Sequence, residues 1–225
     1  MHSSVLIIMT KLPVEGFSKT RLAQSIGDSL ATQVHLAILQ DIKKITQGLA
    51  MDRVIFYAPS SLEDKNVSAF KTLKEIYPED AFFKQHGPDL FENMEVACET
   101  MFSEGYKKVL VIGSDIPEFS LKDFIAALSV LERDDLVFAP SSDGGYSLIG
   151  MRDLSKEVFD IRVESSSQVL ETSCNNLDAH QKSYKFLRTI DDLDTFEDIT
   201  SFLLKVEKHP QLKDYKVYKL VSELV

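Results

Sequence analysis

A cluster of cationic side chains follows the first apolar run of the sequence. Lys11, Lys19 and Arg21 fall within eleven residues, although the whole chain carries a formal net charge of −10. Pro13 and Gly16 lie between them and are typical of a tight turn whose backbone N–H groups can face an anion. Ammonium and guanidinium groups neutralise phosphate oxygens. The pattern therefore indicates a phosphate-binding loop, with a solvated basic turn as the alternative.

The Lys19-Thr20 pair invites comparison with a P-loop. That motif requires a glycine directly before its lysine, and this chain has Ser18 there. The basic loop is therefore not a P-loop, and any anion that it binds is held by a different arrangement.

Carboxylates lie in two further segments of the chain. Asp115 follows an apolar run that ends at Gly113, where a glycine allows close approach of a ligand or of backbone. A carboxylate there suits a hard divalent cation that bridges to phosphate, with a turn or helix-cap role as the alternative. Asp191, Asp192 and Asp194 are crowded together and repel one another unless a cation offsets them. Asp194 could supply a second metal ligand, or the cluster could simply be the charged start of a helix.

The fourth segment runs from Asp143 to Tyr146 and reads Asp-Gly-Gly-Tyr. Asp-Gly-Gly is first of all typical of a hairpin turn. Two adjacent glycines also let a ligand lie against the backbone, with Tyr146 as a wall, and Asp143 is the one candidate for a general base. The five histidines show no ligand spacing, and His35 fits a structural role within a helix.

Alternating apolar and amphipathic runs must position these four motifs. The predicted strands are 5–9, 53–58, 81–83, 108–112, 136–139, 146–151 and 184–188. The predicted helices are 28–48, 61–76, 89–104, 120–132, 165–177, 195–207 and 212–223. This alternation predicts an α/β fold with a mostly parallel sheet and helices on both faces. The rhythm changes after residue 140, and an antiparallel orientation is one interpretation of 146–151. Ligands of such sheets bind at the carboxyl ends of the strands, where the motifs fall.

Composition limits the class of protein. The chain has 225 residues, and its 44% hydrophobic content is ordinary for a globular protein and too high for a disordered one. The excess of 35 Asp and Glu over 25 Lys and Arg argues against a protein that coats nucleic acid. The apolar run at 5–9 is too short for a signal peptide or a membrane span. Cys98 and Cys174 lack metal spacing and fit reduced thiols. We expect one cytoplasmic domain over 1–225 with no nucleic-acid or membrane partner.

Taken in order, the four motifs resemble the DUF2064 family of the nucleotide-diphospho-sugar transferase superfamily, whose fold is called GT-A. In this chain they read Lys-x-Pro-x-x-Gly-x-x-Lys-Thr-Arg-Leu, Gly-Ser-Asp-x-Pro, Asp-Gly-Gly-Tyr-x-Leu-x-Gly and Asp-x-Asp-Thr-x-x-Asp. Relatives of that family include the 2-phospho-lactate guanylyltransferases. The resemblance runs from Val5 to about Leu204. It implies a Rossmann-like α/β/α sandwich with a nucleotide half at about 1–140 and an acceptor half at about 141–225.

The resemblance also implies roles for single residues. The implied nucleotide- and phosphate-binding residues are Lys11, Pro13, Gly16, Lys19, Thr20 and Arg21. The implied substrate-binding residues are Asp89, Gly113, Asp143, Gly144, Gly145 and Tyr146. Asp115 and Asp194 match metal ligands for Mg²⁺ or Mn²⁺. Lys19, Arg21 and Asp143 form the expected catalytic set.

The implied activity is that of a Mg²⁺-dependent transferase that uses a nucleotide sugar or a nucleoside triphosphate with a small acceptor. A guanylyltransferase that makes a phospho-lactate-type cofactor precursor is one alternative, and a non-catalytic nucleotide-binding protein is another. The chain departs from the family pattern in two segments, because Phe91 and Asn93 stand where the family has glycine and arginine, and Glu164 stands where it has tryptophan. An arginine would clamp a phosphate or carboxylate. The oligomeric state stays open, with a homodimer as one option.

Overall fold

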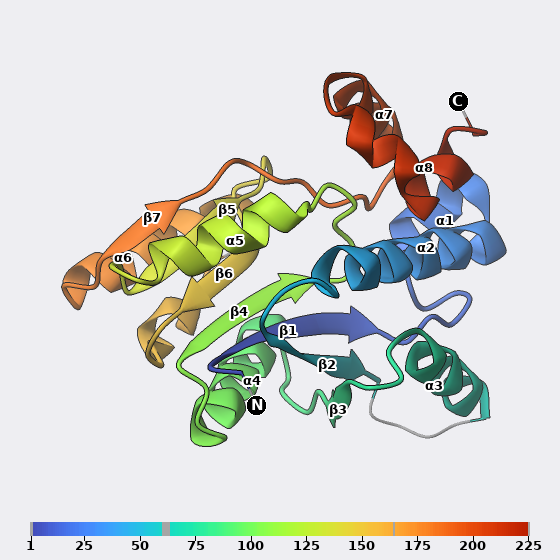
Figure 1. Ribbon diagram of the computed structural model, residues 1–225. Helices are drawn as coiled ribbons and strands as arrows, with labels where there is room; N and C mark the ends of the chain where they lie inside the picture. Colours follow the sequence, from blue (N-terminus) through green and yellow to red (C-terminus); the bar gives the residue numbers. More distant parts are fainter. Residues whose placement is uncertain (1, 60–63, 164, 225) are drawn as a thin grey trace.

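The structure is a computed structural model that describes residues 2–59, 64–163 and 165–224 (Figure 1). Its strands are β1 (Ser4–Lys11), β2 (Asp52–Ala58), β3 (Ala81–Lys84), β4 (Lys108–Gly113), β5 (Leu136–Pro140), β6 (Tyr146–Met151) and β7 (Tyr184–Phe186). Its α-helices are α1 (Thr20–Ile26), α2 (Asp28–Thr46), α3 (Asp64–Ile76), α4 (Leu90–Ser103), α5 (Leu121–Val130), α6 (Val169–Ala179), α7 (Phe196–Lys208) and α8 (Lys216–Val221). Short 3₁₀ helices are η1 (Lys156–Phe159), η2 (Ser166–Gln168) and η3 (Pro210–Asp214).

The described strands form one seven-stranded sheet in the order β3-β2-β1-β4-β6-β5-β7. β6 runs antiparallel to β4 and β5, and every other neighbouring pair is parallel. β1 and β4 lie at the centre of the sheet, where their continuous apolar side chains are buried on both faces. The prediction of a mostly parallel α/β sheet is therefore confirmed, and so is the antiparallel interpretation of 146–151.

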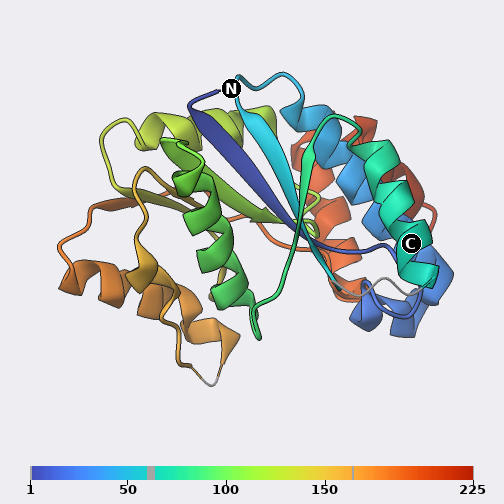
Figure 2. The same ribbon diagram turned by 90° about the horizontal axis from the view of Figure 1, so that it is seen from below.

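Helices cover both faces of the sheet, as the two views show (Figures 1 and 2). Successive side chains of a strand point to opposite faces. On β1, Leu6 and Ile8 therefore join one core with residues of α2, α5, α7 and α8. Ile7 and Met9 join the opposite core with residues of α4, α6 and η1. The result is a three-layer sandwich, and none of its described helices is both long and apolar enough to cross a membrane.

The described elements differ from the predicted ones mainly near the C-terminus. The strand predicted at 184–188 ends at Phe186, after which the chain crosses toward the end of β4. The helix predicted at 212–223 is divided into η3 and α8, and Tyr215 between them donates a 2.9 Å hydrogen bond to the carbonyl of Phe119. α1 was not predicted. Of the helix predicted at 61–76, residues 61–63 lie outside the described part of the chain.

One edge of the sheet collects the chemically interesting segments. β1, β4, β5 and β7 are parallel to one another, so their carboxyl ends meet at the same edge, where β6 begins. Two helices begin at this edge with capping boxes. One joins Ser120 and Asp123 on α5, and the other joins Thr195 and Asp198 on α7. These caps fix the helix ends that border the edge.

The packing around β6 generates a test of the sheet order. A Cβ atom on Gly150 would lie 2.4 Å from Leu110 Cδ2 and 2.8 Å from Val137 Cγ1. We expect Gly150→Ala to lower the free energy of unfolding by about 1–3 kcal/mol, because the core must shift to admit the methyl group. Gly48→Ala is the matched control, since a Cβ atom added there would meet nothing within 4 Å. Urea denaturation of both variants measures the difference, and equal stabilities would contradict this placement of β6.

Candidate active site

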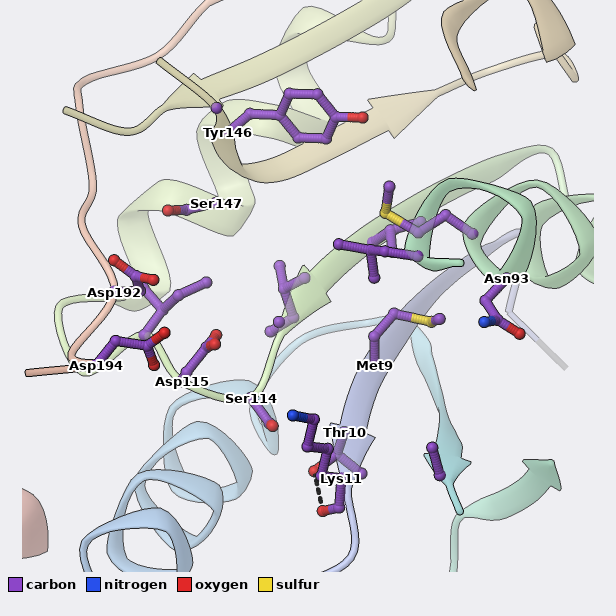
Figure 3. Close-up of a pocket in the computed structure, with 18 of the residues that line it drawn as sticks. Met9, Thr10, Lys11, Asn93, Ser114, Asp115, Tyr146, Ser147, Asp192 and Asp194 are labelled. Atoms are coloured by element: carbon purple, nitrogen blue, oxygen red, sulfur yellow. Dashed lines mark hydrogen bonds between the residues drawn. The ribbon is translucent and has the colours of Figure 1, made fainter. Parts of the chain in front are cut away.

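A pocket of about 770 Å³ opens at the carboxyl edge of the sheet (Figure 3). Most of its walls come from five segments that are far apart in the sequence. They are the β1–α1 loop, the start of α4, the turn after β4, the β5–β6 turn and the segment that leads into α7, and single residues of α2, β2 and α6 complete the lining. All four sequence motifs contribute to these walls, because parallel strands bring their carboxyl ends to one edge.

Three carboxylates converge at one end of the pocket. Asp115 follows β4, whereas Asp192 and Asp194 lie between β7 and α7, and each offers an oxygen within 4.8 Å of the other two. Figure 3 shows the three side chains grouped together. The two segments are joined directly, because the Leu193 N–H donates a 2.9 Å hydrogen bond to the Asp115 carbonyl. Such a set of oxygen donors could hold a hard divalent cation.

Gly113 makes room for the first of these carboxylates. A Cβ atom at this position would lie only 2.5 Å from Asp115 Oδ1. The sequence predicted that Gly113 permits close approach of backbone or ligand. The structure shows that the group that approaches is the carboxylate two residues along the chain.

Asp192 is the member of the cluster that sequence reasoning did not select. In an extended segment, residues two apart point to the same side, so Asp192 and Asp194 face the pocket while Asp191 faces away. Asp191 instead accepts a 2.7 Å hydrogen bond from the Ser142 N–H. Burial, and then the negative charges of Asp115 and Asp194, raise the pKa of Asp192 to about 6. The spacing of two was the signal in the sequence that could have found it.

Asp194 is paired with two cations of the basic loop. The Lys19 ammonium lies 3.1 Å from Asp194 Oδ1, and Arg21 Nη2 lies 3.3 Å from Asp194 Oδ2. Burial by itself would raise the pKa of Asp194, but the charge and hydrogen bond of Lys19 outweigh it and hold that pKa below its usual value. Lys19 is buried and also donates to the Leu193 carbonyl, whereas Arg21 is 72% exposed. Arg21 is therefore the freer of the two to meet a ligand.

The backbone at Lys19 is strained. Its φ of 53° is in the left-handed region, which residues other than glycine rarely adopt. Strain of this kind persists where surrounding contacts overdetermine it, and here the buried ion pair with Asp194 supplies such a contact.

The remaining residues of the basic loop divide into two groups. Lys11 is exposed on the pocket wall with its ammonium 5.6 Å from the Phe17 ring centroid, and Thr20 also lines the pocket. Pro13 is buried and Gly16 has a φ of 74°, and neither is among the described lining residues. These two shape the turn. The N–H groups of Phe17 and residue 18 both donate to the Val14 carbonyl, so the turn itself uses them.

The buried His35 side chain of α2 contacts the end of β1. Its Nε2 lies 3.1 Å from the Lys11 carbonyl oxygen and 3.4 Å from Thr10 Oγ1. Burial, followed by the nearby charge of Lys19, lowers the pKa of His35 to about 4. The imidazole is therefore neutral at physiological pH and fits the structural role expected of it.

The β5–β6 turn is a hairpin, in agreement with the first interpretation of Asp-Gly-Gly. Asp143 Oδ1 accepts hydrogen bonds from Ser141 Oγ and from the Gly145 N–H, so this carboxylate closes the turn. Gly144 has a φ of 91°, and a Cβ there would lie 2.4 Å from the Ser167 carbonyl oxygen. Gly144 thus faces η2 and is not among the described lining residues.

Tyr146 lines the pocket with its ring, while its hydroxyl points away from the carboxylates (Figure 3). Burial raises the pKa of this phenol well above its usual value. The residue therefore presents an apolar face to a ligand, as a wall of the pocket, and keeps its polar tip in the interior.

The position where the family has arginine is occupied by a short amide that binds backbone. Asn93 Nδ2 donates to the carbonyl of Asp89 at 2.6 Å, and its Oδ1 accepts from the Gly87 N–H at 2.8 Å. Asp89 itself caps α4 by accepting from the Glu92 N–H at 2.9 Å. The loop before α4 is therefore tied to the helix by its own side chains. Glu164, the other departure, lies outside the described residues.

A network of ion pairs holds the segment that carries Asp192 and Asp194. Arg188 donates to Asp123 Oδ1 at 2.8 Å and to the Glu118 carbonyl at 2.8 Å. Lys205 of α7 binds the carboxylates of Glu118 and Asp191. Glu118 and Asp123 are buried, so their charges need these partners. The network anchors the segment on both sides of the metal-ligand candidates.

The mostly parallel sheet with one reversed inner strand and helices on both faces defines an α/β protein, and its carboxyl edge carries the acidic cluster. Residues 41–166 match the family model described as "Uncharacterized protein conserved in bacteria (DUF2064)". Because this match covers more than half of the chain, the protein belongs to the DUF2064 family.

Similar proteins agree with this placement. The 2-phospho-L-lactate guanylyltransferase of Methanocaldococcus jannaschii is 29% identical over 164 residues, a match to 72% of this chain and 65% of that protein. The matched part of the chain thus spans less than two thirds of that relative. A crystal structure from Desulfovibrio desulfuricans G20, described as a "putative nucleotide-diphospho-sugar transferase", superposes with a TM-score of 0.88 at 29% identity and covers 99% and 95% of the two chains.

A more distant structure shares the fold alone. A cytidylyltransferase from Leptospira borgpetersenii superposes with a TM-score of 0.57 at 11% identity, over 94% of this chain and 97% of that one. The expected GT-A-like architecture is confirmed by these superpositions and by the sheet order.

The acidic cluster generates a prediction about stability. Because the folded protein raises the pKa of Asp192 to about 6 from 3.8, this group favours folding when protonated, and that contribution is lost as pH rises through 6. At pH 7.5 without metal, we expect Asp192→Asn to be about 1 kcal/mol more stable than the parent, after allowance for solvent screening. The same variant should gain less stability from added Mn²⁺. Thermal unfolding with and without Mn²⁺ measures both effects, and a less stable metal-free variant would contradict the repulsion.

The ion-pair network generates a second prediction. Lys205→Met leaves Glu118 and Asp191 without their ammonium partner, so the segment that carries Asp192 and Asp194 should lose its fixed position. We expect an affinity for Mn²⁺ about tenfold weaker, which is typical for loss of a group that orients metal ligands.

Lys156→Met is the matched control for this variant. Lys156 also binds two carboxylates, those of Glu95 and Glu99, but it is largely exposed and lies outside the pocket wall. Calorimetric titration with Mn²⁺ compares the two variants. Equal affinities would show that the network plays no part in positioning the carboxylates.

Proposed function

We propose that this protein is a metal-dependent nucleotidyltransferase. The observation that carries the proposal is the convergence of Asp115, Asp192 and Asp194 beside cations of the basic loop. A pocket that carries carboxylates and cations side by side suits the complex of a nucleoside triphosphate with a divalent cation, because the carboxylates bind the cation and the cationic side chains bind the phosphates. Burial, and then the negative charges of Asp115 and Asp194, raise the pKa of Asp192, and a bound cation would offset the second of these causes.

The three carboxylates would hold Mg²⁺ or Mn²⁺, which when bound would neutralise charge on the phosphate oxygens. Within the chain, Lys19 would keep Asp194 in place through the buried ion pair. Arg21 and Lys11, both exposed on the pocket wall, would face the phosphates directly. Catalysis of this kind consists mainly of positioning and charge neutralisation.

Each half of the chain would bind one of the two substrates. Thr10, Ala58 and Gln85 line the pocket at the ends of β1 and β2 and just beyond β3, on the side of residues 1–140. We assign the nucleoside to this side, where Gln85 is fixed by donating to the carbonyls of Thr10 and Phe56. The acceptor would lie toward the β5–β6 turn and α6, in residues 141–225.

The candidate general base favours nucleotidyl over glycosyl transfer. Asp143 already accepts two hydrogen bonds within its own turn, which leaves it poorly placed to take a proton from an acceptor hydroxyl. An acceptor phosphate needs no base. Its oxygen forms a bond to the α-phosphorus, the bond between the α-phosphorus and the bridging oxygen breaks, and pyrophosphate leaves. The named activity of the guanylyltransferase relatives is of this type. Glycosyl transfer from a nucleotide sugar is the second candidate, favoured by the description of the Desulfovibrio structure.

Product analysis tests the proposal. The protein is incubated with each nucleoside triphosphate, Mg²⁺ or Mn²⁺ and a panel of phosphorylated acceptors, and released pyrophosphate is measured. We expect metal-dependent release that falls at least about a hundredfold in Asp115→Asn, because a metal ligand is lost. Asp153→Asn is the control, since Asp153 is exposed and follows β6 at the opposite edge of the sheet.

Three outcomes separate the alternatives. Release of a nucleoside diphosphate from a nucleotide sugar would instead establish glycosyl transfer. Metal-dependent nucleotide binding with neither product would establish a non-catalytic binding protein. Equal activities of the Asp115 and Asp153 variants would overturn the assignment of the metal site.

A further inference from the structure

The pocket has a second end, on the side where the acceptor would lie, whose side chains take no part in binding the metal or the phosphates. Beyond the carboxylates it continues between the sheet and the helices α4 and α6 (Figure 3). The side chains that line this part are apolar, and we call it the apolar end. They are Met9, Leu90, Phe91, Met94, Val111, Tyr146, Ile149 and Val169.

The cations that line the described part of the pocket come from one segment of the chain. Among the described lining residues, the lysine and arginine side chains are Lys11, Lys19 and Arg21, and all three belong to the β1–α1 segment. An anionic group placed there would lose its water without gaining an opposite charge, which is costly.

Two polar groups around the apolar end are engaged within the protein. Asn93 uses its amide on the backbone of Gly87 and Asp89. The Leu170 N–H, near the start of α6, donates to the Gly144 carbonyl at 3.0 Å. The Tyr146 hydroxyl is buried without a hydrogen-bond partner among the described residues and points away from the carboxylates (Figure 3). This neutral phenol is uncharged, so it offers an anion no opposite charge.

Leu90 adds an independent observation. It is the first residue of α4, it lines the pocket, and 55% of it is exposed to solvent. An exposed leucine at the rim of a pocket gains burial only when an apolar group lies against it. Together with the walls beyond it, Leu90 favours a ligand with an apolar surface.

We propose that the acceptor carries an apolar, uncharged body that lies in the apolar end and directs its reacting phosphate toward Asp115, Asp192 and Asp194. The role of this ligand as the acceptor rests on the proposed nucleotidyl transfer. The preference of the pocket for an apolar, uncharged ligand body does not depend on that function. The acceptor would thus differ from a phosphorylated carboxylic acid, whose second negative charge would have to enter the apolar end.

Two probes of similar size separate these chemistries. Both 2-phospho-L-lactate and sec-butyl phosphate carry a phosphate on a secondary carbon, and only the first carries a carboxylate. Calorimetric titration into the protein with Mn²⁺ gives their affinities in the absence of any nucleotide. We expect sec-butyl phosphate to bind at least about tenfold more tightly, since an unpaired buried charge costs at least that factor.

A charge introduced at the rim should reverse the preference. In Leu90→Arg the guanidinium can pair with a carboxylate, so 2-phospho-L-lactate should gain about tenfold relative to sec-butyl phosphate. Val96→Arg is the matched control, because Val96 lies on the same helix with 49% exposure but outside the described pocket lining. It should leave the preference unchanged.

Several results would overturn the proposal. Equal or tighter binding of 2-phospho-L-lactate to the parent protein would do so, as would failure of both probes to bind, or equal effects of the two arginine variants. A loss of nucleoside triphosphate affinity in Leu90→Arg with no change toward the probes would assign the apolar end to the nucleobase instead. Failure of nucleoside triphosphates to bind would refute the proposed function while the probe preference could still be measured.

Discussion

Three carboxylates share a space in which their negative charges repel, and the surrounding structure offsets that repulsion. Lys19 places a buried ammonium against Asp194, and Arg21 pairs with the same carboxylate from the solvent side. Asp192 has no such partner among the described ion pairs, and burial together with the charges of Asp115 and Asp194 raises its pKa to about 6. Unfavourable electrostatics of this kind persist at functional sites when the rest of the fold stabilises them.

The sheet and a network of ion pairs stabilise the arrangement of the three carboxylates. β1 and β4 are central strands buried on both faces, so the loops at their carboxyl ends start from rigid positions. Arg188 and Lys205 then fix the segment that crosses this edge by pairing with Glu118, Asp123 and Asp191. Buried ion pairs contribute little net stability but define geometry well, which is what a cluster of metal-ligand candidates requires.

The pocket therefore combines two environments. One end carries fixed charges of both signs and suits a phosphate chain with its cation. The other end is lined by apolar side chains, and the Asn93 amide beside it is bound to backbone. Family membership and the superposition with the Desulfovibrio structure describe the shared framework. At the start of α4, Asn93 uses its short amide to bind backbone and so adds no charge to the apolar end of the pocket.

The sequence by itself determined the sheet, the order of the elements and the four segments at its carboxyl edge. Apolar periodicity reports burial, and the capping box of Thr195 and Asp198 is a local pattern, so both could be predicted without tertiary information. Tertiary structure alone decided which polar groups meet. Asp192 lies in the carboxylate cluster, whereas Asp191 lies outside it. Gly113 leaves room for the Asp115 carboxylate, and Gly144 packs against η2. These outcomes depend on side-chain direction and on contacts between segments up to 175 residues apart, such as Lys19 with Asp194, which local patterns do not encode.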